Sequence, residues 1–149
     1  MRRTPKSWHE LDTTSRTDFP GLFFSNDCFA PLNSRPFQQS TSDGIYNRLS
    51  LLNKLVGLTS DSGERTPDGN DLYQQYFVGE KAWFSDSSDQ EKRQFRNQLT
   101  FAHPERPAKT IFCTMHGKVN SETFPIRIHF SWPEQPRYVV FVGPKITAT

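Results

Sequence analysis

Hydrophobic and polar side chains alternate with a period of two along residues 110–132, which is the pattern of half-buried β-strands. In the first part of this stretch the apolar residues stand at odd positions, and in the second part they stand at even positions. They are Ile111, Cys113, Met115, Val119, Phe124, Ile126, Ile128, Phe130 and Trp132. The change of parity predicts an antiparallel hairpin with these residues on one face, joined by a connection at residues 120–123.

The polar side chains of this hairpin gather on its other face. The register that the connection predicts pairs Val119 with Phe124, Met115 with Ile128 and Cys113 with Phe130. It places His116 opposite Arg127 and Thr114 opposite His129. Lys118 then lies diagonally from Arg127, within reach of a long side chain. We therefore expect a sheet face that carries two imidazoles, a guanidinium and an ammonium group, and no carboxylate.

A third strand is predicted over residues 137–142. Every position after Arg137 is apolar, so we expect this strand to lie inside the sheet or beneath a helix. Gly143 and Pro144 follow, and proline has no amide hydrogen to continue the pairing. Residues 82–84 could add a short edge strand. These segments predict a C-terminal antiparallel sheet of three or more strands.

The firmest helix prediction covers residues 43–58, where apolar residues recur at three- and four-residue steps. Ser42 or Asp43 could cap its start. The stripe consists of Ile45, Leu49, Leu52, Leu55 and Val56. Such a stripe indicates a helix that packs one face on the apolar side of the sheet.

Two shorter helices are predicted between the first helix and the sheet. One covers about residues 71–78, after a loop at residues 59–69 that is rich in Ser, Asp and Gly. The other covers residues 89–99, where Ser88 and Glu91 form a capping box at the start of the helix. With the sheet, these helices predict an α+β domain over residues 43–149.

Residues 1–42 have the composition of an extended arm. Four prolines and many Ser, Thr, Asn and Asp residues argue against a long helix or a central strand. The arm also contains an apolar cluster: Leu22, Phe23, Phe24, Phe29, Leu32 and Phe37. So many aromatic side chains do not ordinarily stay exposed to water. We therefore expect the arm to wrap either its own domain or a partner protein.

Composition narrows the class of protein. Hydrophobic residues make up 34% of the 149 residues, which suits one domain with a small core, and thirteen phenylalanines enlarge that core. The sequence contains no apolar run long enough to cross a bilayer and no signal-like N-terminus, so a cytoplasmic location is expected. In that compartment Cys28 and Cys113 are expected to be free, buried thiols. The net charge of +2 is too small to indicate a partner by itself.

The cationic sheet face is the candidate site. Lys118 and Arg127, with Thr114 and Ser131, could bind a phosphodiester, and His116 and His129 could exchange protons. These groups predict nucleic-acid binding, with RNA favoured over DNA, and would permit metal-independent RNA cleavage. Two alternatives stay open. The face could be an ordinary solvated surface, or the chain could be a non-enzymatic adaptor that docks a protein partner through its Phe-rich arm.

Other chemistries find little support in the sequence. Cys113 and His116 have a zinc-like spacing, but they point to opposite faces of one strand, so we predict no metal site. The chain has no phosphate-binding loop of the G-x-x-x-x-G-K type, no G-x-S-x-G and no G-x-G-x-x-G. We therefore expect no cofactor, and neither nucleotide hydrolysis nor serine hydrolase chemistry.

Overall fold

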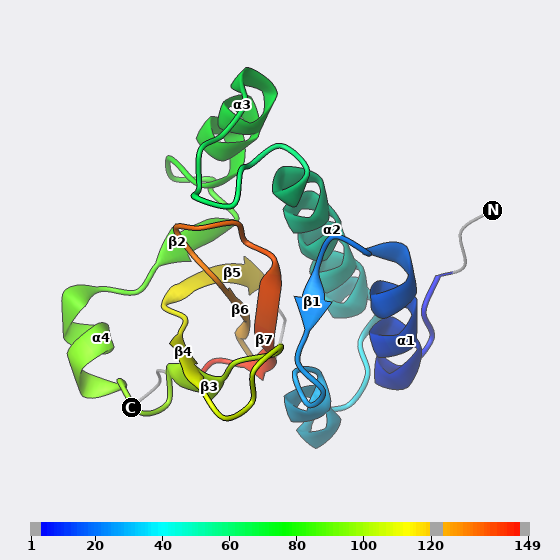
Figure 1. The fold of residues 1–149 in the computed structure, drawn as a ribbon. Helices are drawn as coiled ribbons and strands as arrows, with labels where there is room; N and C mark the ends of the chain where they lie inside the picture. Colours follow the sequence, from blue (N-terminus) through cyan, green and yellow to red (C-terminus); the bar gives the residue numbers. More distant parts are fainter. Residues whose placement is uncertain (1–3, 120–123, 147–149) are drawn as a thin grey trace.

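The computed structural model describes residues 4–119 and 124–146. Its helices are α1 (Trp8–Asp18), the 3₁₀ helix η1 (Ala30–Ser34), α2 (Gln39–Val56), α3 (Pro67–Tyr76) and α4 (Asp89–Gln94). Its strands are β1 (Phe23–Phe24), β2 (Phe84–Asp86), β3 (Thr100–Ala102), β4 (Thr110–Phe112), β5 (Met115–Val119), β6 (Ile126–Phe130) and β7 (Tyr138–Pro144). The α+β class predicted from the sequence is confirmed (Figure 1).

Five strands form the main sheet, in the order β1-β7-β6-β5-β2. β7 lies inside this sheet, as its apolar run predicts. The sheet is mixed rather than antiparallel throughout, because β1 pairs with β7 in parallel. Parallel neighbours need a long crossover, and here almost the whole chain separates the two strands. β3 and β4 form a separate two-stranded hairpin.

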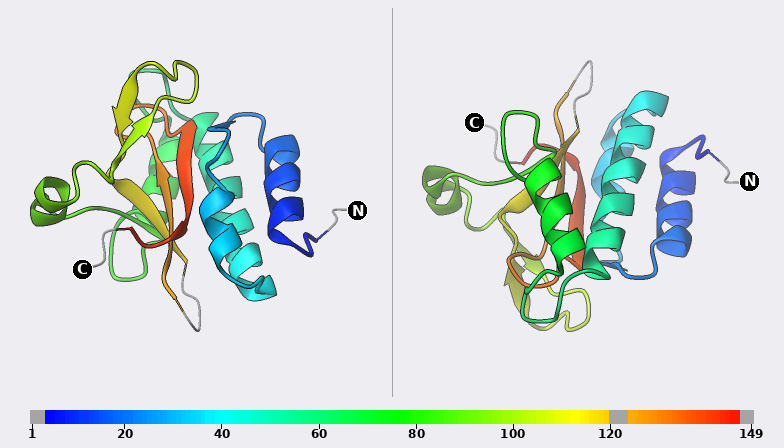
Figure 2. Two further views of the ribbon diagram at one scale, coloured as in Figure 1. Left: turned by 90° about the horizontal axis from the view of Figure 1, so that it is seen from below. Right: turned by 90° about the horizontal axis from the view of Figure 1, so that it is seen from above.

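The main core lies between α2 and one face of the sheet. Ile45, Leu49, Leu52 and Leu55 of α2 are fully buried, as the predicted stripe requires. α1 packs on α2 from the outside, whereas α4 lies on the far side of the sheet from α1 (Figure 2). Among the described residues, no helix is both long enough and apolar enough to span a bilayer.

The N-terminal segment is not the extended arm that its prolines predicted. Residues 8–18 form an α-helix, and Ser7 caps it by accepting a hydrogen bond from the Glu10 amide at 3.0 Å. Pro5 and Pro20 flank this helix instead of interrupting it, so the proline count was misleading. The segment also supplies core residues: Trp8, Leu11, Phe19, Leu22, Phe24, Cys28, Phe29 and Leu32 are all buried.

The other helices differ from the prediction mainly at their ends. α2 begins at Gln39, so neither of the predicted caps, Ser42 or Asp43, stands at its start, and Ser42 is a buried residue of its first turn. α3 begins at Pro67, within the predicted loop, because proline suits the first helical position and Thr66 caps it. The capping box of Ser88 and Glu91 is confirmed, but α4 ends at Gln94, five residues before the predicted end.

The hairpin of β5 and β6 keeps the predicted faces but not the predicted partners. Val119 pairs with Ile126, Gly117 with Ile128, Lys118 with Arg127, and His116 with His129. Each β5 residue thus pairs with a β6 residue two positions further along the chain than predicted. A shift of two leaves every side chain on its own face, so alternation alone does not distinguish the two registers. On the other side of β5, Gly117 pairs with Phe84 of β2, and only hydrogen there leaves room for the Phe84 ring, 2.9 Å from where a Cβ would stand. The predicted connection at residues 120–123 lies outside the described residues.

The predicted first strand is also broken into two. β4 ends at Phe112 and β5 begins at Met115, with Cys113 and Thr114 between them. β4 pairs with β3 instead of β6, with Phe101 opposite Ile111. The β3–β4 hairpin therefore leaves the main sheet and covers part of its polar face. Cys28 and Cys113 are free and buried, as predicted, and burial raises the pKa of each thiol to about 12.

Candidate functional site

The structure brings four of the six predicted site residues together on two rungs of the β5–β6 pair, with the Gly117–Ile128 rung between them. Lys118 lies directly opposite Arg127, and His116 lies directly opposite His129. The two imidazole rings are 5.4 Å apart between centroids. The four side chains share one face because positions two apart on a strand point the same way. We call this group the cationic rungs.

The two histidines are buried, which the sequence did not indicate. His129 is 1% exposed, and its ring packs against Phe101 of β3 and Phe141 of β7, at 6.0 and 5.7 Å between centroids. His116 is 9% exposed. The β3–β4 hairpin closes over a face that we expected to be open to solvent.

Each histidine donates a hydrogen bond from Nδ1 to a backbone carbonyl. His116 donates to Thr114 at 3.1 Å, and His129 donates to Cys113 at 3.0 Å. A carbonyl oxygen only accepts, so both Nδ1 atoms carry the hydrogen and both neutral rings have their lone pair on Nε2. The break between β4 and β5 supplies these two carbonyls, because they are not used in pairing with β6.

Burial lowers the pKa of both imidazoles. The pKa of His116 falls to about 4 and that of His129 to about 3, because desolvation penalises the charged ring, and the nearby Arg127 adds repulsion. Both rings are therefore neutral at pH 7. A neutral imidazole can accept a proton, but cleavage with two histidines also needs a protonated one as the acid. The arrangement thus favours binding over cleavage.

Arg127 is half-buried and incompletely satisfied. Its Nη1 donates to the Ile126 carbonyl at 3.0 Å, whereas its Nε is buried and has no hydrogen-bond partner within the described structure. Burial lowers the pKa of the guanidinium, and the negative charge of Glu91 opposes this effect. A buried donor without a partner is costly, most of all on a charged group. The buried Nε is out of reach from solvent, so an anion could bind only the part of the guanidinium that remains exposed.

Helix α4 adds a carboxylate that the sheet pattern did not reveal. The charge of Glu91 acts on His116, His129 and Arg127, raising the pKa of each against the effect of burial. The same carboxylate accepts a hydrogen bond from the Ser88 amide at 3.3 Å as part of the capping box. The sequence identified that helix cap, but not that the cap lies near the cationic rungs.

The other two predicted site residues have structural roles. Thr114 donates its hydroxyl to Asp86 at 2.6 Å, and Asp86 also forms an ion pair with Lys92. Ser131 donates to the Gln135 carbonyl at 2.7 Å and accepts from the Tyr138 amide, which closes the connection between β6 and β7. The partners of these hydroxyls are Asp86 and the β6–β7 connection, so the structure does not bring Thr114 and Ser131 to Lys118 and Arg127.

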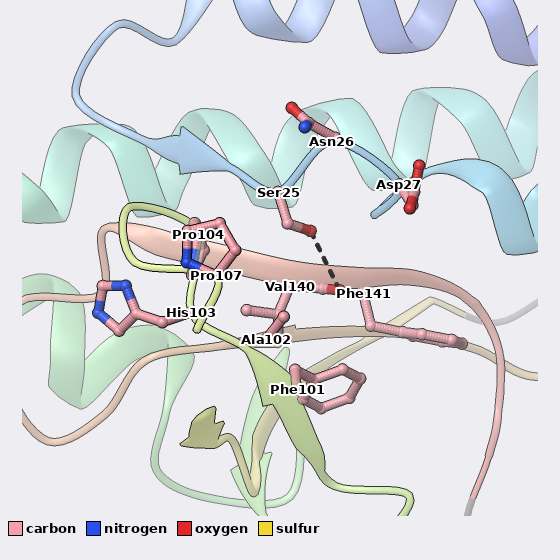
Figure 3. Close-up of a pocket in the computed structure, with 10 residues that line it drawn as sticks. All are labelled: Ser25, Asn26, Asp27, Phe101, Ala102, His103, Pro104, Pro107, Val140 and Phe141. Carbon is pink, nitrogen blue, oxygen red and sulfur yellow. Dashed lines mark hydrogen bonds between the residues drawn. The ribbon is translucent and has the colours of Figure 1, made fainter. Parts of the chain in front are cut away.

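A pocket that the sequence did not reveal is lined by Phe101 and Phe141, the two rings that pack on His129. Figure 3 shows its lining residues. Its volume is about 400 Å³, within the range of ligand pockets. Phe101 and Phe141 form an apolar wall with ring centroids 6.2 Å apart. The bulge between His129 and Phe130 shifts the register with β7, so that Val140 and Phe141 both line this pocket. We call it the Phe101–Phe141 pocket.

No group of three or more His, Cys, Asp and Glu side chains among the described residues could hold a metal ion. The strand break does remove our first argument against zinc, since Cys113 and His116 no longer lie on one continuous strand. Cys113 is nevertheless buried, with a raised pKa, while thiolate is the form that binds zinc.

Any function for this chain has to be inferred from the geometry of the candidate site. The site consists of two cationic side chains, two neutral imidazoles, one nearby carboxylate and an adjacent aromatic pocket. Such a site can bind an anion and a flat apolar group next to each other. No family model, no curated protein and no solved structure matches this chain.

Proposed function

We propose that this protein binds nucleic acid, with RNA favoured over DNA, through the phosphate group of a backbone held by Arg127 and Lys118. The observation that carries the proposal is the pair of partly exposed cations, Arg127 and Lys118, which lie directly opposite each other on one face of the sheet. Arginine suits phosphate because its fork of donors can bind two oxygens at once, and lysine adds a point charge. A phosphate would give the two cations a shared anion and would accept hydrogen bonds from their exposed N–H groups.

Cleavage of the bound strand is not part of the proposal. Both histidines are neutral at pH 7, and His129 is too enclosed to reach a ribose hydroxyl. Their role in the proposal is to pack beneath the site without adding positive charge. The face then carries two cations, which a single phosphate and the neighbouring Glu91 can balance.

Docking of a protein through residues 1–42 is less well supported. The aromatic side chains that suggested it are mostly buried in the chain's own core, Phe24 and Phe29 among them. Phe23 is 39% exposed and is the only exposed phenylalanine in the described structure. One such side chain is ordinary on a protein surface. We therefore place nucleic-acid binding first.

Replacing Arg127 with alanine is expected to weaken binding of a labelled single-stranded RNA at least tenfold at low salt. Hydrogen bonds to charged groups contribute about 1.5–3 kcal/mol, and about 1.4 kcal/mol corresponds to a factor of ten. Fluorescence anisotropy measures the affinity, and circular dichroism checks the fold. Arg137→Ala is the matched control, because Arg137 already has an ion-pair partner in Glu105 at 3.3 Å. Equal affinities for Arg127→Ala and the parent protein would refute the proposal.

A further inference from the structure

The Phe101–Phe141 pocket is built from three segments that are far apart in the sequence. The β3–β4 hairpin contributes Phe101 and Ala102, and the loop after β3 contributes Pro104 and Pro107. β7 contributes Val140 and Phe141, and the segment after β1 contributes Ser25, Asn26 and Asp27. Figure 3 shows the two phenylalanine rings together below Ser25. Three independent segments meeting around one space make a defined pocket.

The pocket combines a flat apolar wall with a few polar groups. Phe101 and Phe141 are half-buried, so part of each ring remains accessible. The Ser25 hydroxyl lies on the opposite wall, where it donates to the Val140 carbonyl at 3.5 Å, a long and weak bond (Figure 3). Asn26 and Asp27 are exposed at the rim. A planar group with polar edges suits this composition.

Phe141, which lines the pocket, is two rungs away from the proposed phosphate contact. Phe141 pairs with His129, and Gly143, two residues along β7, pairs with Arg127. Two residues of a strand span about 7 Å. The Phe141 ring also leans toward Gly143, since its tip is 3.3 Å from where a Cβ on Gly143 would stand. Phe141 and Arg127 therefore lie on the same face of the sheet, two rungs apart.

We propose that the Phe101–Phe141 pocket takes an unpaired nucleobase of a single strand whose phosphate lies on Arg127 and Lys118. This inference rests on the proposed function. Stacking on phenylalanine needs an exposed base face, which a single strand offers and a duplex does not. Every base has such a face, so binding at this pocket is tolerant of sequence.

The test compares two probes of equal charge: an eight-nucleotide single-stranded RNA and an abasic ribose–phosphate strand of the same length. Because the phosphate contribution is the same for both, the ratio of their affinities reports contacts to bases. We expect the parent protein to prefer the RNA about tenfold, consistent with the loss of one base stack in the abasic strand. Arg127→Ala should weaken both probes.

Three variants locate the base contact. Phe101→Ala removes part of the wall, and Ala102→Trp fills the pocket from an exposed position of β3 without removing a core contact. Both should abolish the preference for the RNA while retaining binding to the abasic strand. Phe23→Ala removes an exposed ring outside the pocket and should leave the preference unchanged.

The outcomes separate the two proposals. If the parent protein binds both probes equally, or if the pocket variants keep the preference, the assignment of the pocket is wrong while phosphate binding stands. If the parent protein binds neither probe, the proposed function is wrong and the pocket assignment falls with it.

Discussion

A chain that lacks residues 1–38 is expected not to fold. The deletion removes α1, β1 and η1, and with them Leu11, Leu32 and six further buried apolar side chains. Full burial of one large apolar side chain contributes about 1.5–3 kcal/mol, whereas whole domains are stable by only about 5–15 kcal/mol. Near-ultraviolet circular dichroism of residues 39–149 should therefore show no fixed tertiary structure. A fragment that unfolds cooperatively would show instead that the first 38 residues are a dispensable arm.

A matched pair of substitutions tests the same point in the full chain. Leu11 on the inner face of α1 is 0% exposed, so Leu11→Ala should lower the free energy of unfolding by about 2–5 kcal/mol. Thr17 lies on the exposed side of the same helix, and Thr17→Ala should change it by no more than about 0.5 kcal/mol. Urea unfolding measures both. Similar values for the two variants would mean that α1 does not belong to the core.

Lowering the pH from 7 to 4.5 is expected to destabilise the protein by roughly 2–5 kcal/mol through His116 and His129. Below about pH 6.5 the unfolded chain takes up a proton on each imidazole. The folded protein does not, because its pKa values are about 4 for His116 and about 3 for His129. The unfolded state thus binds more protons, so stability falls as the pH falls across this window.

The variant His129→Asn isolates one of the two groups. Asparagine can still donate to the Cys113 carbonyl, but it does not titrate. We expect lower stability at pH 7, from lost packing, and about half of the parent's loss between pH 7 and 4.5. Urea unfolding at several pH values gives the slopes; equal slopes for His129→Asn and the parent would contradict the burial of His129.

Local patterns predicted the parts of the fold that depend on local physics. The apolar stripe of α2 and the capping box of α4 were identified because each is encoded within a few turns of helix. α1 was missed because its first turn follows a proline and only Trp8, Leu11 and Ser15 are buried, which is too sparse a pattern to recognise. The parallel pairing of β1 with β7 joins segments over a hundred residues apart and has no local signature.

The candidate site was predicted in its composition but not in its surroundings. Alternation placed His116, Lys118, Arg127 and His129 on one face, and the structure agrees. Alternation did not reveal that the β3–β4 hairpin would cover the histidines. The apolar and polar positions continue to alternate through the strand break at Cys113 and Thr114, so the pattern gave no sign of the break. The Phe101–Phe141 pocket depends on a bulge in β7. An extra residue makes a bulge whether or not it is apolar, so the apolar run of β7 did not reveal it.

The salt dependence of RNA binding tests the phosphate site most directly. For a single strand, the logarithm of the binding constant falls with the logarithm of salt concentration by about 0.7 for each phosphate contact. We predict that Arg127→Ala reduces the steepness of this slope by about 0.7. Arg137→Ala, just before the start of β7, should leave the slope unchanged. An Arg127→Ala slope equal to that of the parent protein would contradict the account, because Arg127 would then hold no phosphate.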